Sequence, residues 1–190
     1  MFHRQTTVAY FMIASISAIM TTPGFAKDST ESEALAAQTT GRIPAEITHC
    51  NDGDTCRAKI AGNLWMNVRL AGIDAPELAK KRKKTSAQAF AEEARDWLNN
   101  SVKQQPVELL QHDLDHFNRP IVELYVGQRL INIEMLRHGL AEVYQGKTKR
   151  LDRTPYLAAE AAAKEKKIGI WSQKNYQSPK DFRRAGAAQK

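Results

Sequence analysis

Three strand-like segments, joined by two tight-turn sequences, most constrain the fold of this chain. Residues 43–50 and 54–61 flank the Asp-Gly dipeptide 52–53, and residues 64–71 follow the Gly-Asn dipeptide 62–63. Glycine and asparagine adopt the backbone angles that short hairpin turns need, so these dipeptides favour β-hairpins. We therefore expect an antiparallel meander of three strands.

The third segment alternates apolar and polar residues, which is typical of a strand with one buried face. Its apolar positions share one face: Leu64, Met66, Val68 and Leu70. Successive side chains of a strand point to opposite faces. Arg69 is therefore expected on the face opposite the core.

Three helices are predicted from capping residues and apolar periodicity. The first follows Thr85, which matches a capping box with Gln88. Four apolar residues then recur at helical spacing: Phe90, Ala94, Trp97 and Leu98. The second helix is expected over residues 132–138. The third begins at Thr154, followed by a proline that suits the first turn, and stops near residue 169.

Two more strands are expected, at residues 107–111 and 121–126. Five short strands with three helices indicate an α+β fold that contains a small closed or partly closed barrel. The number and order of the strands match the OB-fold. We therefore expect one domain over residues 42–173, a five-stranded OB-fold β-barrel with three α-helices, in a monomeric protein.

Residues 1–26 have the three parts of a secretory signal peptide. Arg4 supplies the positive charge, residues 8–20 are apolar apart from serines and one tyrosine, and Gly24 and Ala26 suit the cleavage site. The apolar run is shorter than the roughly 20 residues that cross a bilayer. We expect an exported protein, periplasmic or extracellular, without membrane contact once the signal is removed.

Two further segments flank the expected domain. Residues 27–41 are polar and Ala-rich without periodicity, which predicts a linker. Residues 174–190 are basic and poor in apolar residues, which predicts a basic tail ordered only near its start.

The net charge of the chain is +7, and removal of residues 1–26 takes away Arg4 and no acid. A positive field of this size raises the local concentration of polyanions. Nucleic acid is one such partner, although charge alone also fits anionic surfaces.

Cys50 and Cys56 flank the first turn, and export permits a disulfide between them. A loop of residues 52–54 would place Cys50 opposite Cys56, whereas a two-residue loop would place it opposite Thr55. Both pairings remain open from the sequence. A structural zinc site is disfavoured because no pair of histidines accompanies the cysteines.

Asp52 and Asp54 have different expected roles. Asp52 belongs to an Asp-Gly turn and is expected to form it. Asp54 shares its face with Cys56 and Ala58, so its carboxylate lies at the edge of a packed surface. A carboxylate in such a place needs a cation or strong hydrogen-bond donors.

Asp74 and Glu77 follow the third strand, and Pro76 fixes the chain between them. They could simply cap this segment and face water. Alternatively, Asp54 and Asp74 with a backbone carbonyl offer oxygen ligands that suit Ca²⁺ or a similar hard ion. The spacing does not match an EF-hand loop.

Two arginines could complete a phosphate-binding site. Arg69 precedes Asp74, and Arg119 precedes the last strand. A planar guanidinium binds two phosphate oxygens at once, and two of them could neutralise the charge that builds on a reacting phosphate. Each arginine taken alone fits a surface residue better than a phosphate ligand.

A basic run follows Glu77: Lys80, Lys81, Arg82, Lys83 and Lys84. It is either a solvated loop or a contact with the phosphate backbone, and in the second case binding would depend on salt. The histidines lack the spacing of a metal site. The absence of a Gly-rich phosphate loop and of a nucleophile elbow disfavours nucleotide hydrolases and serine hydrolases.

Taken in order, these segments resemble the thermonuclease (staphylococcal nuclease-like) family. The resemblance covers about residues 43–173, and its pieces are Asp-Gly-Asp-Thr 52–55, residues 69–77, Asp115 with Arg119, residues 132–141 and residues 170–172. A single Asp-Gly-Asp-Thr sequence would be weak evidence, whereas the ordered set is strong.

The resemblance implies an OB barrel with three helices and Ca²⁺-dependent endonucleolytic cleavage of DNA and RNA to 3′-phosphate products. Asp54, Asp74 and the carbonyl of Ala75 would bind one Ca²⁺ ion. Glu77 would orient or deprotonate the attacking water. Arg69 would bind the phosphate while bridging towards Glu77.

The resemblance also implies that Arg119 stabilises the transition state. It further indicates which residues would contact nucleic acid. His116 and Phe117 stand where Lys-Tyr is common, and Tyr144 alone occupies a stretch where two tyrosines often pack on the nucleotide. The alternative function is a non-catalytic OB-fold module that binds nucleic acid. Degenerate relatives of that kind lose acids or arginines, and none is lost here.

Overall fold

The computed structural model describes residues 41–60, 63–79 and 86–188. The predicted signal peptide and almost all of the predicted linker lie outside these residues. Thr85 and the basic run also lie outside them, including Lys80, Lys81, Lys83 and Lys84. Expectations for those residues stay predictions.

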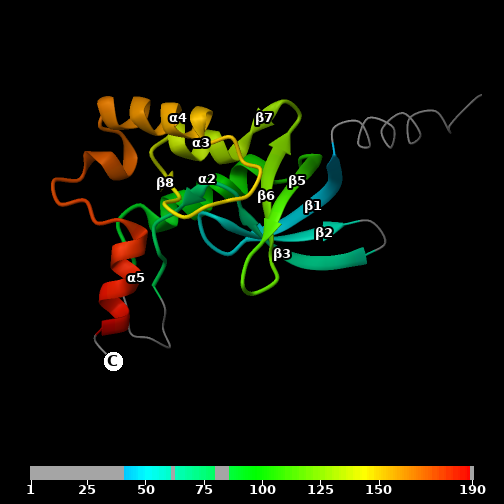
Figure 1. Cartoon of the computed structure of the whole chain (residues 1–190), viewed down its shortest axis with the longest axis horizontal. Coiled ribbons are helices and arrows are strands. Elements are labelled where there is room, and N and C mark those ends of the chain that lie inside the picture. Colours follow the sequence, from blue (N-terminus) through cyan, green and yellow to red (C-terminus); the bar gives the residue numbers. More distant parts are fainter. Residues whose placement is uncertain (1–40, 61–62, 80–85, 189–190) are drawn as a thin grey trace, which may run out of the picture.

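Five strands close into a barrel (Figure 1). They are β1 Arg42–Cys50, β2 Thr55–Ile60, β3 Leu64–Leu70, β5 Val107–Leu114 and β6 Pro120–Val126. The order of pairing is β3-β2-β1-β5-β6, and a parallel pairing of β3 with β6 closes the circle. The predicted α+β fold with a five-stranded barrel is confirmed, although β5 runs to Leu114 rather than to residue 111.

Three further strands are short. β7 Arg129–Leu130 lengthens the sheet beside β6. β4 Ile73–Asp74 pairs with β8 Glu142–Val143 in a separate two-stranded sheet. Because β4 follows β3 after a turn, this small sheet lies at the end of β3 and sets Asp74 opposite Glu142.

The alternation in β3 accounts for its orientation in the barrel. Val68 and Leu70 are buried in the core, whereas Arg69 between them points to the other face with its side chain 16% exposed. Burying one Val or Leu side chain contributes roughly 1.5–3 kcal/mol. The two apolar neighbours therefore fix the direction of Arg69, as the sequence predicted.

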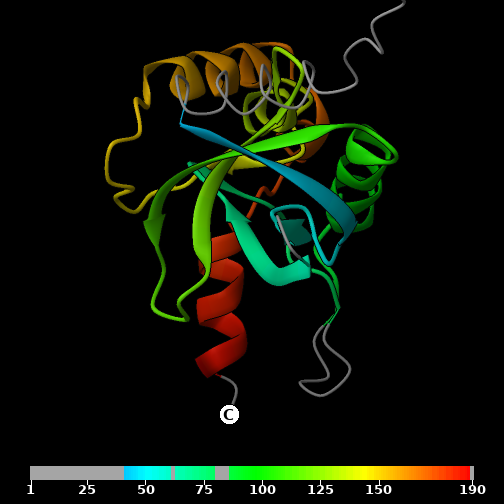
Figure 2. The same cartoon turned by 90° about the vertical axis from the view of Figure 1, so that its right-hand side faces the viewer.

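Four helices lie in the described part of the chain: α2 Ala91–Val102, α3 Ile131–Arg137, α4 Thr154–Glu165 and α5 Pro179–Ala188. A 3-10 turn, η3 Gly169–Ser172, follows α4. α3 and α4 lie along one edge of the molecule and α5 lies at the opposite edge in both views (Figures 1 and 2). Among the described residues, no helix has the length and apolar character needed to span a membrane.

The predicted start of α2 is wrong. The helix begins at Ala91, so Gln88 is not in its first turn. The Oε1 atom of Gln88 accepts a hydrogen bond from the backbone N–H of Glu77 at 2.9 Å, and its amide donates to the carbonyl of Gln177 at 3.0 Å. The Gln88 side chain, which a capping box would use, therefore bonds to residues outside the helix. The predicted apolar stripe is confirmed at buried Leu98.

A buried amide joins α3 to the end of β3. Asn132 is fully buried; its oxygen accepts from the N–H of Leu124 at 2.9 Å, and its nitrogen donates to the carbonyls of Ala71 and Val122 at 2.9 and 3.1 Å. Buried polar groups of this kind are costly unless paired. Asn132 therefore holds the chain where it leaves the barrel and enters β4.

The C-terminal segment differs from the predicted tail, because it contains α5. Ser178 Oγ accepts a hydrogen bond from the N–H of Asp181 at 3.1 Å, as a helix N-cap does. Pro179 opens the helix, where a missing N–H costs nothing. Just before α5, the ring centre of Tyr176 lies 4.6 Å from that of Trp171. The segment is therefore docked on the domain.

Candidate active site

The turn between β1 and β2 carries Asp54. The Oδ1 atom of Asp52 accepts hydrogen bonds from the N–H of Asp54 at 3.1 Å and from that of Thr55 at 2.7 Å. The N–H of Asn51 donates to the carbonyl of Thr55 at 2.8 Å. Asp52 therefore forms the turn, as predicted, and Asp54 lies directly before β2.

A disulfide closes this turn. Cys50 lies directly opposite Cys56 in the β1–β2 pairing, and their sulfur atoms are bonded. Of the two pairings that the sequence left open, the longer loop is confirmed. The bridge ties together the two strands that hold Asp54.

Gly53 lets the turn pack against β4 and α2. A Cβ atom at Gly53 would lie 2.6 Å from the Cβ of Ala75 and 2.9 Å from that of Ala94. Carbon atoms in contact are about 3.5–4.0 Å apart, so a larger residue does not fit without a shift. The close approach brings Asp54 beside Ala75, whose N–H donates to Asp54 Oδ2 at 2.9 Å.

Arg69 joins the two aspartates. One nitrogen of its guanidinium lies 2.5 Å from Asp54 Oδ2, and the other lies 3.1 Å from Asp74 Oδ1. Both aspartates are buried, with exposed fractions of 8% and 1%. A buried charge needs a paired partner, and Arg69 supplies one to each carboxylate.

A second arginine reaches the same acids from the far end of the sequence. Arg183 on α5 donates to both oxygens of Asp74, at 3.0 and 2.8 Å, and to Glu77 Oε1 at 2.9 Å. These hydrogen bonds, those to Asp74 first, raise the pKa of Arg183 above its ordinary value. The bridge to Glu77 that the resemblance assigns to Arg69 is made by Arg183 in this structure.

Burial shifts the ionisation of the acids. It raises the pKa of Asp54 to about 6, opposed by the charge of Arg69 and assisted by that of Asp52. Burial likewise raises the pKa of Glu142, which faces Asp74 across the β4–β8 pair. Burial therefore disfavours the ionised forms of these acids, and a bound cation would favour them.

The loop between β5 and β6 carries Arg119. Its Nε donates to Asp115 Oδ2 at 2.7 Å, and its backbone N–H donates to Oδ1 at 2.9 Å. Burial alone would raise the pKa of Asp115, but the hydrogen bonds from Arg119 and Phe117 hold it below its ordinary value. The guanidinium lies 5.5 Å from the centre of the Phe117 ring. The Asp-x-x-x-Arg spacing is thus a salt bridge that fixes Arg119.

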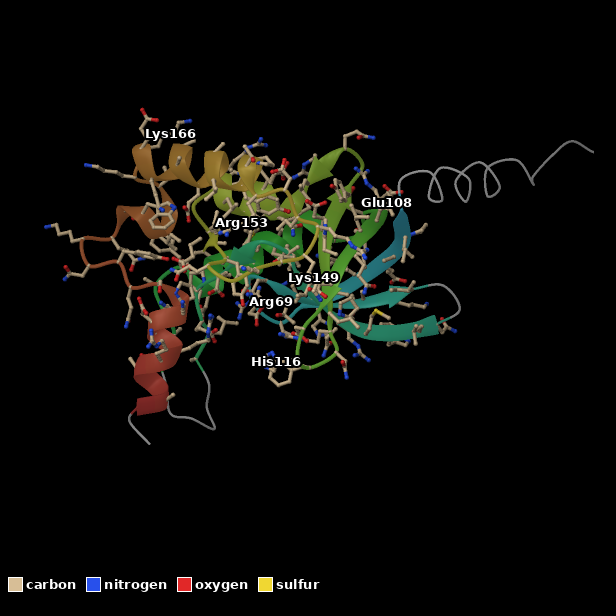
Figure 3. The ribbon with its side chains drawn as sticks, viewed as in Figure 1. Arg69, Glu108, His116, Lys149, Arg153 and Lys166 are labelled. Carbon is tan, nitrogen blue, oxygen red and sulfur yellow. A yellow bond between two sulfur atoms is a disulfide. The ribbon has the colours of Figure 1, made fainter. Side chains whose placement is uncertain are left out.

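One cavity of about 550 Å³ brings the two sides together. Among its charged lining residues are Asp54, Arg69, Glu77, Arg119 and Arg183. Asp74 is bonded to two of these, Arg69 and Arg183. Three predicted nucleic-acid contacts line the same cavity: His116, Phe117 and Tyr144. Figure 3 shows Arg69 in the middle of the molecule and His116 on the β5–β6 loop.

A family model described as staphylococcal nuclease homologue matches residues 67–173. This chain belongs to that family. It is similar to a probable endonuclease LCL3 of Phaeosphaeria nodorum, with 33% identity over 150 residues that cover 75% of this chain and 50% of that protein. It is also similar to an uncharacterized endonuclease of Haemophilus influenzae, with 32% identity over 151 residues that cover 79% and 78%.

A third relative is a probable endonuclease lcl3 of Pyrenophora tritici-repentis, 39% identical over 114 residues that cover 56% of this chain and 41% of that protein. The chain therefore spans half or less of the length of these two fungal relatives, and most of the length of the bacterial one.

The donor set of this staphylococcal nuclease homologue fits a hard metal ion. Within the described residues, no group of three or more His, Cys, Asp and Glu side chains is arranged as a metal site. Asp54 and Asp74 nevertheless share one cationic partner, and the backbone of Ala75 lies beside them. Two buried carboxylates and a carbonyl offer oxygen atoms only, which is what Ca²⁺ binds.

Among the residues that line the cavity, sequence reasoning missed Lys147, Thr148 and Arg183. For Arg183 a signal was present, because Ser-Pro-x-Asp at residues 178–181 is a helix-start pattern. Lys147 and Thr148 belong to the irregular segment after β8, where no motif marks them. This segment is tied to β5 by the ion pair of Lys149 with Asp113 at 3.2 Å.

Proposed function

We propose that this member of the staphylococcal nuclease family is an exported endonuclease that hydrolyses phosphodiester bonds of DNA and RNA with one Ca²⁺ ion, to 3′-phosphate products. The observation that carries the proposal is the single cavity in which Arg69, Glu77 and Arg119 meet beside the Asp54–Asp74 pair. Hydrolysis at phosphorus needs a positioned water and donors for the charge that builds on the phosphate oxygens. This cavity offers groups for both tasks.

Asp54, Asp74 and the carbonyl of Ala75 would hold the ion. When bound, it would polarise a phosphoryl oxygen and bring the attacking water near the phosphorus. The close packing of Gly53 on Ala75 already sets the turn that bears Asp54 against the strand that bears Asp74. Little movement of the backbone is needed to present both carboxylates.

Glu77 orients the attacking water and accepts its proton. Its carboxylate lines the cavity, with the side chain 18% exposed. Its backbone N–H is held by Gln88 at 2.9 Å, which fixes the start of the segment after β4. A carboxylate within hydrogen-bond reach of a water is a competent general base.

Arg69 and Arg119 bind the phosphate from two sides. A guanidinium presents two parallel N–H groups to two phosphate oxygens. Asp115 holds Arg119 in place before the substrate arrives, so its charge is available without reorganisation as negative charge builds. Arg69 donates to the same phosphate from the β3 side.

Aromatic side chains at the mouth of the cavity would stack on bases. Phe117 is 68% exposed and Tyr144 is 37% exposed, and His116 packs on Phe117 with ring centres 3.8 Å apart. Every base has a flat face, so stacking binds single strands with little sequence preference. This supports activity on both DNA and RNA, and Lys80, Lys81, Lys83 and Lys84 are proposed to add phosphate contacts.

Export is supported by the predicted signal peptide and by the bond between Cys50 and Cys56. Disulfides persist in oxidising compartments and are rare in the cytosol. The proposed location is therefore the periplasm or the medium, where the protein acts as a monomer.

Incubation of the protein with DNA or RNA, with Ca²⁺ or with EDTA, tests the proposal. We expect cleavage only with Ca²⁺ and products that carry 3′-phosphate ends. Lack of cleavage with every divalent ion tried would exclude the proposed nuclease activity.

Glu77→Gln separates the enzyme from a non-catalytic OB module that only binds nucleic acid. Loss of a general base lowers kcat by about 10²–10⁴-fold, while binding of DNA should persist. The exposed Glu165 on α4 provides the control, Glu165→Gln, with unchanged activity. Equal cleavage by both variants would place the activity elsewhere.

A further inference from the structure

Arginine engages both oxygens of Asp74. Oδ1 accepts from Arg69 at 3.1 Å and from Arg183 at 3.0 Å, and Oδ2 accepts from Arg183 at 2.8 Å. The contact with Arg183 is bidentate, the arrangement in which a guanidinium binds a carboxylate most strongly. Arg183 therefore occupies the carboxylate of Asp74 in the way that a bound metal ion would.

A metal ion needs the same oxygen atoms. Calcium takes 6–8 oxygen ligands at 2.3–2.6 Å. The two guanidiniums already use both lone pairs of Asp74 Oδ1 and one lone pair of Oδ2. From this conflict we infer that Arg183 competes with the metal ion for Asp74, so that the C-terminal helix is an intramolecular competitor of metal binding. The inference rests on the metal site of the proposed function.

Arg183 rather than Arg69 is the partner that gives way. The Arg69 side chain is 16% exposed, and its strand neighbours are buried in the core. The Arg183 side chain is 38% exposed, so water can solvate its charge when it leaves Asp74.

The rest of the C-terminal segment keeps Arg183 close to the site. Ser178 and Pro179 are buried, Tyr176 donates to Glu142 at 2.6 Å, and Lys180 contacts Gln145 at 3.2 Å. None of these contacts involves Asp54 or Asp74. A group tethered in this way acts at a high effective concentration, so it lowers the apparent metal affinity in proportion to the time it spends on Asp74.

The two arginines also compensate the charge of the clustered acids. Asp54, Asp74 and Glu77 lie together, and an unpaired buried charge is strongly unfavourable. Arg69 and Arg183 together contact all three carboxylates. Arg69 and Arg183 thus balance the charge of the acids, and a bound metal ion would take the place of Arg183.

Calorimetric titration with Ca²⁺ of the full chain, Arg183→Gln and Arg184→Gln tests this inference. Arg184 is exposed and is the next residue of the same helix, so its variant has the same net charge and controls for long-range attraction. If Arg183 holds Asp74 nine-tenths of the time, Arg183→Gln should bind Ca²⁺ about tenfold more tightly. Arg184→Gln should differ by less than about twofold, because exposed charges are screened.

Thermal unfolding adds a readout that a general charge effect would not produce. In EDTA, Arg183→Gln should have a Tm about 2–4 °C below that of the unmodified protein, because Asp74 loses a partner. In saturating Ca²⁺ the difference should disappear, since residue 183 then makes no contact with Asp74 in either protein.

Three results would overturn the inference, and they are distinguishable. If the unmodified chain binds Ca²⁺ and cleaves DNA while Arg183→Gln binds it no more tightly, competition is wrong and the proposed function stands. If Arg183→Gln binds Ca²⁺ more weakly, Arg183 supports the metal site instead. If neither protein binds Ca²⁺, both the proposed calcium site and the competition of Arg183 for Asp74 are wrong.

Discussion

Arg119 and Arg183 line the same cavity, yet different kinds of partner hold them. Arg119 is paired with Asp115, four residues earlier in the same loop, through two hydrogen bonds. Arg183 is paired with Asp74 and Glu77, more than one hundred positions earlier in the sequence. One arginine is fixed locally, and the other depends on the docking of a separate helix.

The difference shows what each arginine can do when a ligand arrives. Asp115 has no other proposed role, so it can keep Arg119 in place throughout a reaction. Asp74 and Glu77 are themselves proposed to bind the metal ion and the water, so their contact with Arg183 cannot survive unchanged. Arg119 on the β5–β6 loop is therefore a preorganised charge, whereas Arg183 on α5 can exchange its carboxylate partner when a ligand binds.

The largest expected effect is on turnover. Arg119→Lys keeps the charge but loses the planar fork, and removal of one preorganised donor lowers kcat by about 10²–10³-fold. Arg183→Lys in saturating Ca²⁺ should stay within about twofold of the unmodified protein, because the metal has already displaced residue 183. Steady-state kinetics on DNA measures both, and equal losses would erase the distinction between the two arginines.

The next effect concerns the stability of the turn that carries Asp54. Replacement of both Cys50 and Cys56 by Ser should lower the free energy of unfolding by about 2 kcal/mol, as expected for a bridge that closes so short a loop. Denaturant unfolding with and without reductant measures it. If reductant destabilises the double variant as much as the unmodified chain, the loss does not come from the bridge.

Asp115→Asn tests whether the local salt bridge positions Arg119. Loss of one charged hydrogen-bond partner should lower kcat by about tenfold, or about 1.4 kcal/mol. The affinity for Ca²⁺ should not change, because Asp115 is not a proposed ligand, whereas Asp74→Asn should abolish Ca²⁺ binding. A change in the calorimetric Ca²⁺ affinity of Asp115→Asn would show that the two sides of the cavity are coupled.

The smallest effect is on substrate binding at the exposed rim. Phe117→Ala should weaken binding of single-stranded DNA by about 1 kcal/mol, the low end for base stacking, because most of the ring faces water. Leu157→Ala on α4, which also removes an exposed apolar side chain, is the control. Fluorescence titration with an oligonucleotide should show no loss for the control, and similar losses for both would argue against stacking.

Local signals in the sequence predicted much of the barrel and part of the site. The alternation in β3 correctly set the direction of Arg69, and the Asp-Gly turn correctly separated Asp52 from Asp54. The register of the cysteines stayed open because two loop lengths were compatible with the same residues. The start of α2 was wrong because Gln88 bonds to Glu77 and Gln177, and no local pattern reports such distant partners.

By itself, the sequence determined the five strands of the barrel and the turn at Asp52, and it set Asp115 four residues before Arg119. Each depends on residues a few positions apart, where backbone geometry dictates which side chains meet. Only the tertiary structure decided that α5 brings Arg183 to Asp74. That contact joins positions 109 residues apart, and it exists because several separate packing contacts dock the C-terminal segment beside β4.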